Sequence, residues 1–249
     1  MENARVITLT GQSRYPGADP EVWERFLKWS QEVYGQVLMR VPQRRGVDMY
    51  QIVRESPLFP ANLWILHYEN YAVFENARKN PEAISISSEF ISWMKRGIID
   101  TAWSAVYQLI KSYRSDISKS EEQPDTRIEN APFLHLEAYR LTVEDSGKYS
   151  KWFFDYCSNV FIPLFMKQPG LQGYDYYKHI GIAVNYENLM EKEYPAYLSA
   201  IYFENIRDFE NFEKSSELAI CRKTLRNIFP SGLNYKWYVQ CELVRSLKR

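Results

Sequence analysis

Three residues that could carry proton-transfer chemistry alternate along one predicted strand. His135, Glu137 and Tyr139 occupy every second position of the segment 133–141, and alternate side chains of a β-strand point to the same face. The three side chains would form a row, with ~7 Å between neighbours. The alternate residues of this segment are apolar and would meet the helices, so we expect the row to point away from the helices, into the barrel. In such a row His135 or Glu137 could act as a general base while Tyr139 steadies a developing oxyanion. The alternative is that the three groups only satisfy one another by hydrogen bonds.

Two more candidates lie at the end of another predicted strand, over residues 63–69. His67 and Glu69 share one face of this strand, and we expect them to line the same cavity as the first row. Glu69 could instead act as a local cap on the helix that follows. The remaining histidine, His179, stands near a strand end before a glycine, so we expect it at the surface.

The common catalytic and metal-binding motifs are missing from the sequence. No two histidines have the spacing of a metal-binding pair, and there is no P-loop, dinucleotide fingerprint or nucleophile elbow. We therefore predict chemistry without a metal or a nucleotide cofactor. The three cysteines show no paired spacing, which favours a reducing compartment over a disulfide framework; they are Cys157, Cys221 and Cys241.

Composition is that of a soluble globular protein. The 249 residues are 45% hydrophobic and 25% charged. Lys plus Arg and Asp plus Glu both number 31, so the chain has no basic footprint for a nucleic-acid partner. The apolar runs are strand-sized, well short of the ~20 residues of a membrane helix, and no apolar segment follows Met1 as in a signal peptide. We predict a cytoplasmic protein without a membrane partner.

Aromatic residues are abundant, at 16% of the chain, with 19 Tyr, 13 Phe and 7 Trp. They indicate either a tightly packed core or a cavity walled by rings for a flat, apolar ligand. If a cavity exists, four aromatic side chains are expected to contact an aromatic substrate: Tyr176, Tyr202, Trp103 and Trp237.

The chain contains an internal repeat. Three pairs of segments match in residue type and order: 60–76 with 195–211, 42–50 with 169–177, and 109–112 with 243–246. Within the first pair, His67 stands where Tyr202 stands in the second copy. We therefore expect any site at a position where the two halves differ.

The apolar periodicities predict an α+β fold with the order strand, helix, strand, strand, helix, strand in each half, which is the ferredoxin-like arrangement. We assign repeat 1 to residues 1–112, a polar linker to 113–131 and repeat 2 to 132–249. Each sheet would have one bare apolar face that must be covered. Packed sheet to sheet within one chain, the repeats would close an eight-stranded barrel; the alternative is that each faces another chain, as in a homodimer.

A short motif resembles a known family. Residues 68–82 resemble the strand end and following helix of the antibiotic biosynthesis monooxygenase-like domains, which belong to the dimeric α+β barrel superfamily. Those domains carry a Phe-Glu-x-His segment on the helix. This chain keeps Phe74-Glu75, but Ala77 stands in place of the histidine, and Phe212 does so in the second copy. The departure argues against a haem or catalytic role at that position.

The resemblance leaves three functions open. The first is an enzyme that acts without a cofactor on an aromatic or polyketide-like small molecule, by oxygenation or by proton transfer in a dehydration, cyclisation or isomerisation. The second is a haem protein with His67 or His135 as the iron ligand. The third is a non-catalytic ligand-binding protein.

Overall fold

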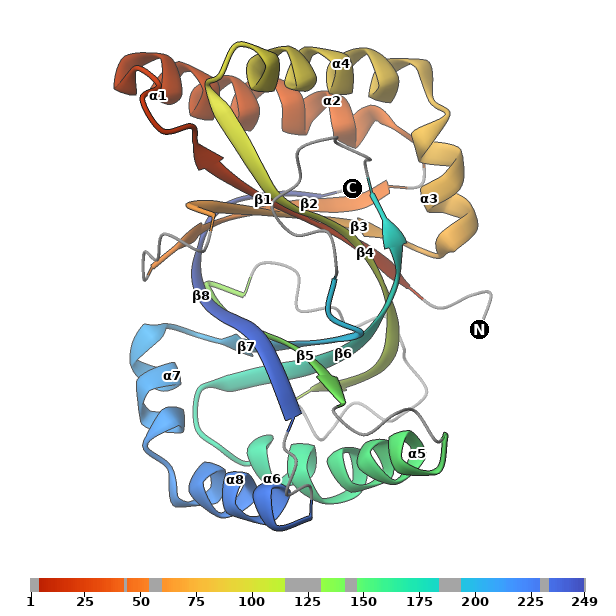
Figure 1. Cartoon of the computed structure of the whole chain (residues 1–249), viewed down its shortest axis with the longest axis vertical. Helices are drawn as coiled ribbons and strands as arrows, with labels where there is room; N and C mark the ends of the chain where they lie inside the picture. The colour runs from red at the N-terminus through yellow and green to blue at the C-terminus, as the bar shows by residue number, and fades with distance from the viewer. Residues whose placement is uncertain are drawn as a thin grey trace. The chain divides into compact units, whose positions relative to one another are not determined.

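The computed structural model describes residues 5–42, 44–53, 60–114, 131–141, 147–183, 194–228 and 233–248. The first half of the chain contains β1 (Val6–Arg14), α1 (Pro20–Trp29), η1 (Ser30–Tyr34), α2 (Gly35–Arg40), β2 (Arg44–Ile52), β3 (Asn62–Tyr68), α3 (Tyr71–Arg78), α4 (Pro81–Lys95) and β4 (Ile99–Arg114). The second half contains β5 (Phe133–Leu141), α5 (Gly147–Tyr156), η2 (Cys157–Phe161), α6 (Ile162–Phe165), β6 (Leu171–Ile182), β7 (Tyr197–Phe203), α7 (Ile206–Glu213), α8 (Ser216–Ile228) and β8 (Leu233–Lys248). Both halves therefore have the same order of elements (Figure 1). In each half a π-helical turn lies inside the first helical stretch.

The strands form one closed barrel in the order β1-β3-β2-β8-β5-β7-β6-β4. Consecutive strands of the same half pair antiparallel, as β2 with β3 and β6 with β7. The last strand of each half is inserted beside the second strand of the other half, so β8 pairs with β2 and β4 lies next to β6. This insertion brings residues from the end of the chain next to residues of its first half.

The chain divides into two compact units. Unit 1 comprises Met1–Leu109, His179–Tyr194 and Cys241–Arg249, and unit 2 comprises Ile110–Lys178 and Pro195–Gln240. The units are defined by contacts, whereas the repeats 1–112 and 132–249 are defined by sequence similarity, so the repeat assignment stays a prediction. Most of the expected linker lies outside the described residues; its first part continues β4 as far as Arg114.

Side-chain caps start the helices where the sequence places them. Asn70 accepts a hydrogen bond from the backbone N–H of Val73 at 3.0 Å, and Asn205 accepts one from Asp208 at 3.0 Å. These two asparagines are equivalent positions of the repeated segment. An N-cap acceptor satisfies a backbone N–H that has no partner inside the helix, so the repeat fixes where α3 and α7 begin.

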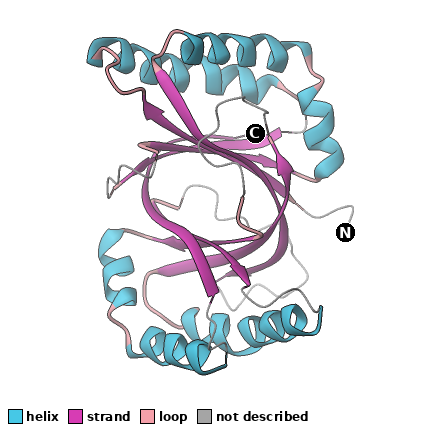
Figure 2. Cartoon of the chain, in the orientation of Figure 1, coloured by secondary structure: helices cyan, strands magenta, loops and turns pink. Residues whose placement is uncertain are grey.

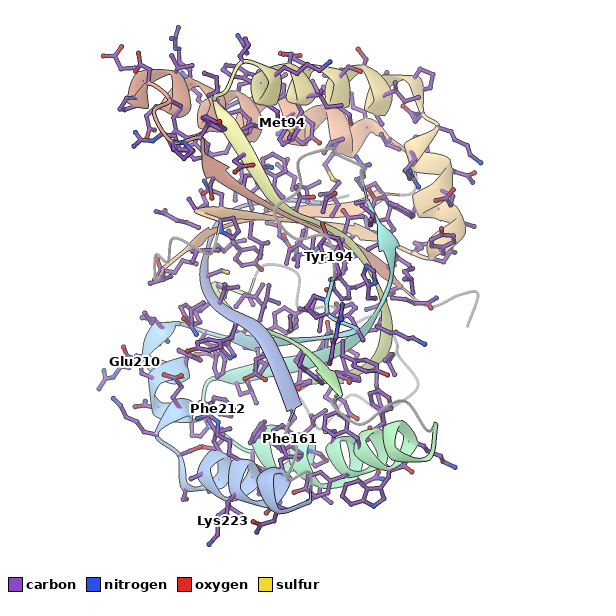
Figure 3. All side chains as sticks on the ribbon, in the orientation of Figure 1. Met94, Phe161, Tyr194, Glu210, Phe212 and Lys223 are labelled. Carbon is purple, nitrogen blue, oxygen red and sulfur yellow. The ribbon has the colours of Figure 1, made fainter. Side chains whose placement is uncertain are left out.

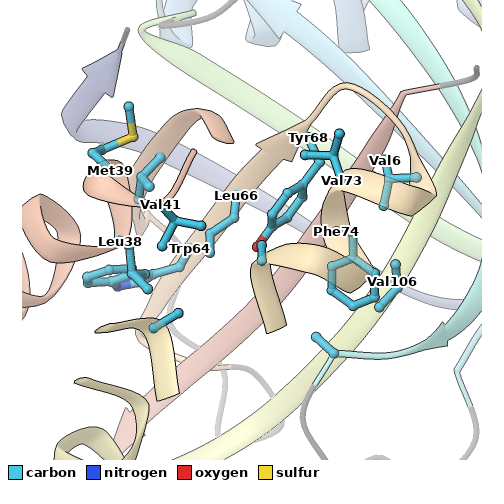
Figure 4. Close-up of a cluster of buried hydrophobic side chains, with 14 of the residues drawn as sticks. Val6, Leu38, Met39, Val41, Trp64, Leu66, Tyr68, Val73, Phe74 and Val106 are labelled. Carbon is cyan, nitrogen blue, oxygen red and sulfur yellow. The ribbon is translucent and has the colours of Figure 1, made fainter. Parts of the chain in front are cut away.

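In unit 1 the helices cover one face of the sheet (Figure 2). Trp64, Leu66 and Tyr68 of β3 pack with residues of α2, α3 and α4 in one buried apolar cluster (Figure 4). Val47 and Met49 of β2 join the same cluster. Because side chains alternate along a strand, the residues between these point to the other side, which we call the helix-free face.

In unit 2 the helix side of the sheet is built from aromatic rings. Phe203 of β7 lies 5.6 Å from Phe209 and 5.4 Å from Phe212, both on α7. Phe212, which Figure 3 labels, also meets a ring of α6, since its centroid lies 4.8 Å from that of Phe165. Rings of this size bury large apolar areas and pack well edge to face. Part of the high aromatic content is therefore core.

None of the described helices is long and apolar enough to cross a lipid bilayer.

Candidate functional site

A buried carboxylate on β2 organises a polar cluster on the helix-free face of unit 1. Oδ2 of Asp48 lies 2.8 Å from Nε2 of His67 on β3. Ser246 of β8, which faces Asp48 directly in the strand register, donates its hydroxyl to Oδ1 at 2.5 Å. We call Asp48, His67 and Ser246 the first carboxylate cluster. Each oxygen of Asp48 thus has its own partner.

The electrostatics of this cluster keep Asp48 ionised. Burial raises the pKa of the Asp48 carboxyl, but the nearby His67 outweighs burial, with help from the Ser246 hydroxyl and the positive charge of Lys248, and the pKa lies below its usual value. An ionised carboxylate only accepts hydrogen bonds, so Nε2 of His67 carries the proton and donates it. Nδ1 then holds a lone pair, and it has no hydrogen-bond partner among the described residues.

Gly46 of β2 lies opposite His67 in the register of β2 and β3. A Cβ atom at this position would lie 3.3 Å from the Leu247 carbonyl oxygen and 3.7 Å from the His67 ring. A Cβ at this position would therefore be tight against the Leu247 carbonyl and only in ordinary contact with the imidazole.

Apolar side chains surround His67 along the sheet. Ile7 of β1 faces His67 in the strand register, and Tyr107 of β4 faces Ile7. Ile65, two residues before His67, lies on the same face, and all three side chains are buried. An imidazole in such surroundings could accept a proton from a weakly acidic group on an apolar molecule.

Unit 2 contains a second buried carboxylate, which like Asp48 is bound by a serine hydroxyl and by a residue of the neighbouring strand. Asp175 of β6 accepts hydrogen bonds from the hydroxyl of Ser112, from Arg114 at 2.6 and 3.2 Å, from Tyr202 at 3.0 Å and from Tyr177 at 3.2 Å. We call these five residues the second carboxylate cluster. Burial lowers the pKa of Arg114, but the Asp175 carboxylate outweighs it and the pKa lies above its usual value. Both oxygens of Asp175 are fully used by these donors.

The two clusters occupy equivalent positions of the internal repeat. Asp48 and Asp175 lie in the matched segments 42–50 and 169–177, and Ser246 and Ser112 end the matched segments 243–246 and 109–112. The third position differs, because His67 is replaced by Tyr202 in the second copy. The expectation that a polar site lies where the halves differ thus leads to His67.

Comparison with known proteins identifies the fold. No family model matches the chain, and no curated protein matches it. A protein from Fusobacterium nucleatum subsp. nucleatum, provisionally named a monooxygenase, is similar in structure, with a TM-score of 0.60, 11% identity and coverage of 100% of this chain and 96% of that one. An anthrone oxidase-like protein matches with a TM-score of 0.64, 10% identity and coverage of 99% and 93%. The chain has the dimeric α+β barrel fold.

A third neighbour with the dimeric α+β barrel fold is a mutant chlorite dismutase from Candidatus Nitrospira defluvii in complex with cyanide. Its TM-score is 0.56 at 10% identity, and the match covers 98% of this chain and 92% of that one. The TM-scores establish a common fold, whereas sequence identities of 10–11% leave the chemistry to be argued from the residues of this barrel.

The row on β5 faces the other way from our prediction. The ring of His135 lies 4.8 Å from Phe209 of α7, and the ring of Tyr139 lies 6.0 Å from Phe153 of α5. These residues therefore lie on the helix side of the barrel strand, and the expectation that they point away from the helices is wrong. The aromatic helix layer of unit 2 accommodates a polar row because the row is hydrogen-bonded.

Those hydrogen bonds use both ring nitrogens of His135. Nε2 lies 3.2 Å from Glu137, and Nδ1 lies 3.2 Å from the side-chain amide of Gln240. The hydroxyl of Tyr139 is 3.5 Å from that of Ser199. The contacts match the alternative in which these groups satisfy one another. A catalytic role for His135, Glu137 and Tyr139 stays a prediction without an observed contact that favours it.

The other predicted residues are scattered. Tyr176 stacks on Tyr197 at 6.0 Å on the helix side, away from the face expected for a substrate contact. Tyr202 lies on the helix-free face but is bound to Asp175. The side chains of Trp103 and Trp237 lie outside the described part of the chain.

Two more sequence-based expectations concern charged residues. Glu69 was expected to line the cavity with His67 or to cap the following helix. It is exposed and forms an ion pair with Arg45 at 3.1 Å. His179 lies within β6 and is partly buried between the rings of Tyr107 and Tyr194, each at 5.4 Å, so the surface position expected for it is wrong. Figure 3 marks Tyr194.

Sequence reasoning missed the two aspartates and their serines. The available signal was an Asp at the same position of two matched segments, between Val47 and Met49 in one and between Tyr174 and Tyr176 in the other. A charge in a buried strand is rarely left unpaired. Applied to the sequence alone, that rule singles out Asp48 and Asp175.

Haem fits only one of the two histidines that the resemblance offered as ligands. Both nitrogens of His135 are engaged, by Glu137 and Gln240, so it does not fit as an iron ligand. His67 keeps Nδ1 available while Asp48 holds Nε2, and metal-binding histidines commonly donate their other N–H to a carboxylate.

Proposed function

We propose that this protein is an enzyme acting on a small molecule, with Nδ1 of His67 as a general base. The base takes a proton from a weakly acidic C–H or O–H group of an aromatic or polyketide-like substrate. The resulting anion then reacts with O2, or rearranges in a dehydration, cyclisation or isomerisation. No cofactor is needed for the proton transfer. We also propose that the barrel consists of two ferredoxin-like repeats of one chain, packed sheet to sheet.

The observation that carries the proposal is the pairing of Asp48 with His67. A carboxylate that accepts the Nε2 proton fixes the tautomer and the orientation of the imidazole. The negative charge of Asp48 also stabilises the imidazolium that forms when Nδ1 takes up a proton. His135, by contrast, has both of its ring nitrogens engaged, by Glu137 and Gln240.

Two further observations support the choice of substrate class. Ile7, Ile65 and Tyr107 make the surroundings of His67 apolar, which suits a neutral ring system better than a charged metabolite. The names of two structural neighbours, a monooxygenase and an anthrone oxidase-like protein, are consistent with oxidation of such molecules.

Anthrone provides a direct test, because its methylene group is a weak carbon acid. Its oxidation is balanced by one O2, which yields anthraquinone and one water molecule. We expect O2 uptake and quinone absorbance with the wild-type protein, and a fall of about 10²-fold or more in His67→Gln and Asp48→Asn, the usual contribution of a general base. Tyr177→Phe, which removes one hydrogen bond in the second carboxylate cluster, is the matched control and should retain the rate. Full activity of His67→Gln would refute the assignment of the base.

Haem binding through His67 is the second candidate function, favoured by the carboxylate on its Nε2. His67 would hold the iron, which would supply redox chemistry. Added haem should then give a Soret band that His67→Ala loses and His135→Ala keeps. A spectrum that does not change on adding haem excludes this function.

A further inference from the structure

We propose that Ser246 is a positioning residue that keeps Asp48 directed at the His67 base. This inference rests on the proposed function and extends it to a residue near the end of the chain. Ser246 lies on β8, directly opposite Asp48 in the register with β2. It reaches the reacting group only through the carboxylate.

The geometry assigns each carboxylate oxygen of Asp48 a separate task. Ser246 donates to Oδ1 at 2.5 Å, and Nε2 of His67 lies 2.8 Å from Oδ2. Rotation of the carboxylate would break both hydrogen bonds, so the serine resists such rotation. Asp48 is buried, and water cannot easily replace the serine as a donor.

The second carboxylate cluster supports this inference independently. Ser112 donates to Oδ1 of Asp175, while Oδ2 accepts the hydroxyl of Tyr202. The serine and the aspartate are thus retained where His67 has been replaced by a tyrosine. In both copies the serine occupies one oxygen and directs the other to the residue on the next strand, whether that residue is an imidazole or a phenol.

The basic residue two positions after each serine completes the comparison. Arg114 binds both oxygens of Asp175, whereas its counterpart Lys248 is exposed and acts on Asp48 only through its charge. Asp175 therefore has a cation to hold it in place as well as a serine. Within the described residues, the hydrogen bonds to the Asp48 carboxylate come from Ser246 and His67, so removing Ser246 should loosen it.

The test is ¹⁵N NMR of the imidazoles in the full-length protein without ligand, which reports the tautomer of each histidine. In the wild type we expect His67 as the Nε2–H tautomer, with a slowly exchanging, downfield Nε2 proton. Ser246→Ala should reduce the fraction of that tautomer at least twofold and broaden or remove the proton signal. Ser246→Thr, which keeps the hydroxyl, should restore both. Ser112→Ala removes the equivalent bond in the second cluster and should leave His67 unchanged.

Unchanged His67 signals in folded Ser246→Ala would overturn the proposal. If that variant does not fold, Ser246→Cys takes its place, because a thiol of similar size donates only weakly. Turnover of anthrone separates this inference from the proposed function. A shifted tautomer together with full activity of His67→Gln leaves the positioning role intact and refutes the base. Unchanged His67 signals in Ser246→Ala together with an inactive His67→Gln refute the positioning role and leave the base intact.

Discussion

At the scale of single residues, the chemistry of this chain depends on which polar side chains have an atom available to a ligand. His135 has both nitrogens engaged, and Asp175 has both oxygens engaged by four residues. His67 is anchored on one side only. A group with an anchored side and an available side can exchange a proton with a ligand without losing its position. This distinction separates a candidate base from a structural network.

The pKa of Asp48 leads to a prediction about stability and pH. Its folded pKa lies below the unfolded value of 3.8, so its contribution to the free energy of unfolding is complete above that value. The contribution is lost as the pH falls through the folded pKa. Asp48→Asn should therefore cost the most stability near pH 7, about 1.5–3 kcal/mol for hydrogen bonds to a charged group, and progressively less as the pH is lowered toward 2. Urea unfolding of both proteins across this range measures the difference; a constant difference would contradict the assignment.

A second residue-scale prediction concerns the row on the helix side. His135→Ala should lower the free energy of unfolding by about 1–3 kcal/mol, because Gln240 and Glu137 lose their partner in a buried place. Glu69→Gln breaks only the half-exposed pair with Arg45. It should change the free energy of unfolding by less than about 1 kcal/mol. Chemical denaturation compares the two. An unchanged free energy of unfolding in His135→Ala would show that these contacts do not stabilise the strand.

At the scale of elements, the sequence determines where helices start better than which way strands face. Asn70 and Asn205 carry the local signal for a cap, and both act as caps. Alternation on β5 separates its side chains into two sets, but it does not say which set meets the helices. That choice depends on rings from α5 and α7, such as Phe153 and Phe209, which are distant in sequence. The orientation of His135 was therefore not available from its own strand.

The caps can be tested as repeated features. Asn70→Ala and Asn205→Ala should each lower the free energy of unfolding by about 1 kcal/mol, the typical value of an N-cap. Asn76→Ala changes an exposed position inside α3 to a better helix former, so it should be neutral or slightly stabilising. Equal effects of Asn70→Ala and Asn76→Ala in thermal unfolding would mean that the cap contributes nothing.

Two glycines with positive φ separate backbone strain from steric contact. Gly17 has φ of +85° and open space around it, while Gly170, between α6 and β6, has φ of +75° and would place a Cβ in steric overlap with the carboxyl group of Asp208. Gly17→Ala should cost about 1–2 kcal/mol, for the left-handed backbone alone. Gly170→Ala should cost clearly more, because Asp208 must also move. Similar losses of unfolding free energy for the two variants in denaturant titrations would show that the Asp208 side chain moves aside at little cost.

At the scale of the whole molecule, the matched segments of the two halves carry two buried carboxylates with different surroundings. The repeat was evident from the matched segments, and the asymmetry between His67 and Tyr202 pointed to the first copy. The pairing of Asp48 with Ser246 was not evident, because it depends on the insertion of β8 beside β2. Strand order across a barrel is a long-range property that matched segments of sequence do not specify.

If the second cluster is structural, breaking it should be more harmful than the equivalent change in the first. Arg114→Met removes a buried partner of Asp175 and leaves an uncompensated charge, which costs about 3–5 kcal/mol in buried pairs. Adding Asp175→Asn should recover part of that loss, because the unpaired charge is then gone, and a double-mutant cycle measures the recovery. Lys248→Met, at the equivalent position, removes an exposed charge and should be milder. Equal losses for Arg114→Met and Lys248→Met would show that the two copies share one role, and the division into a proton-transfer copy and a structural copy would then fail.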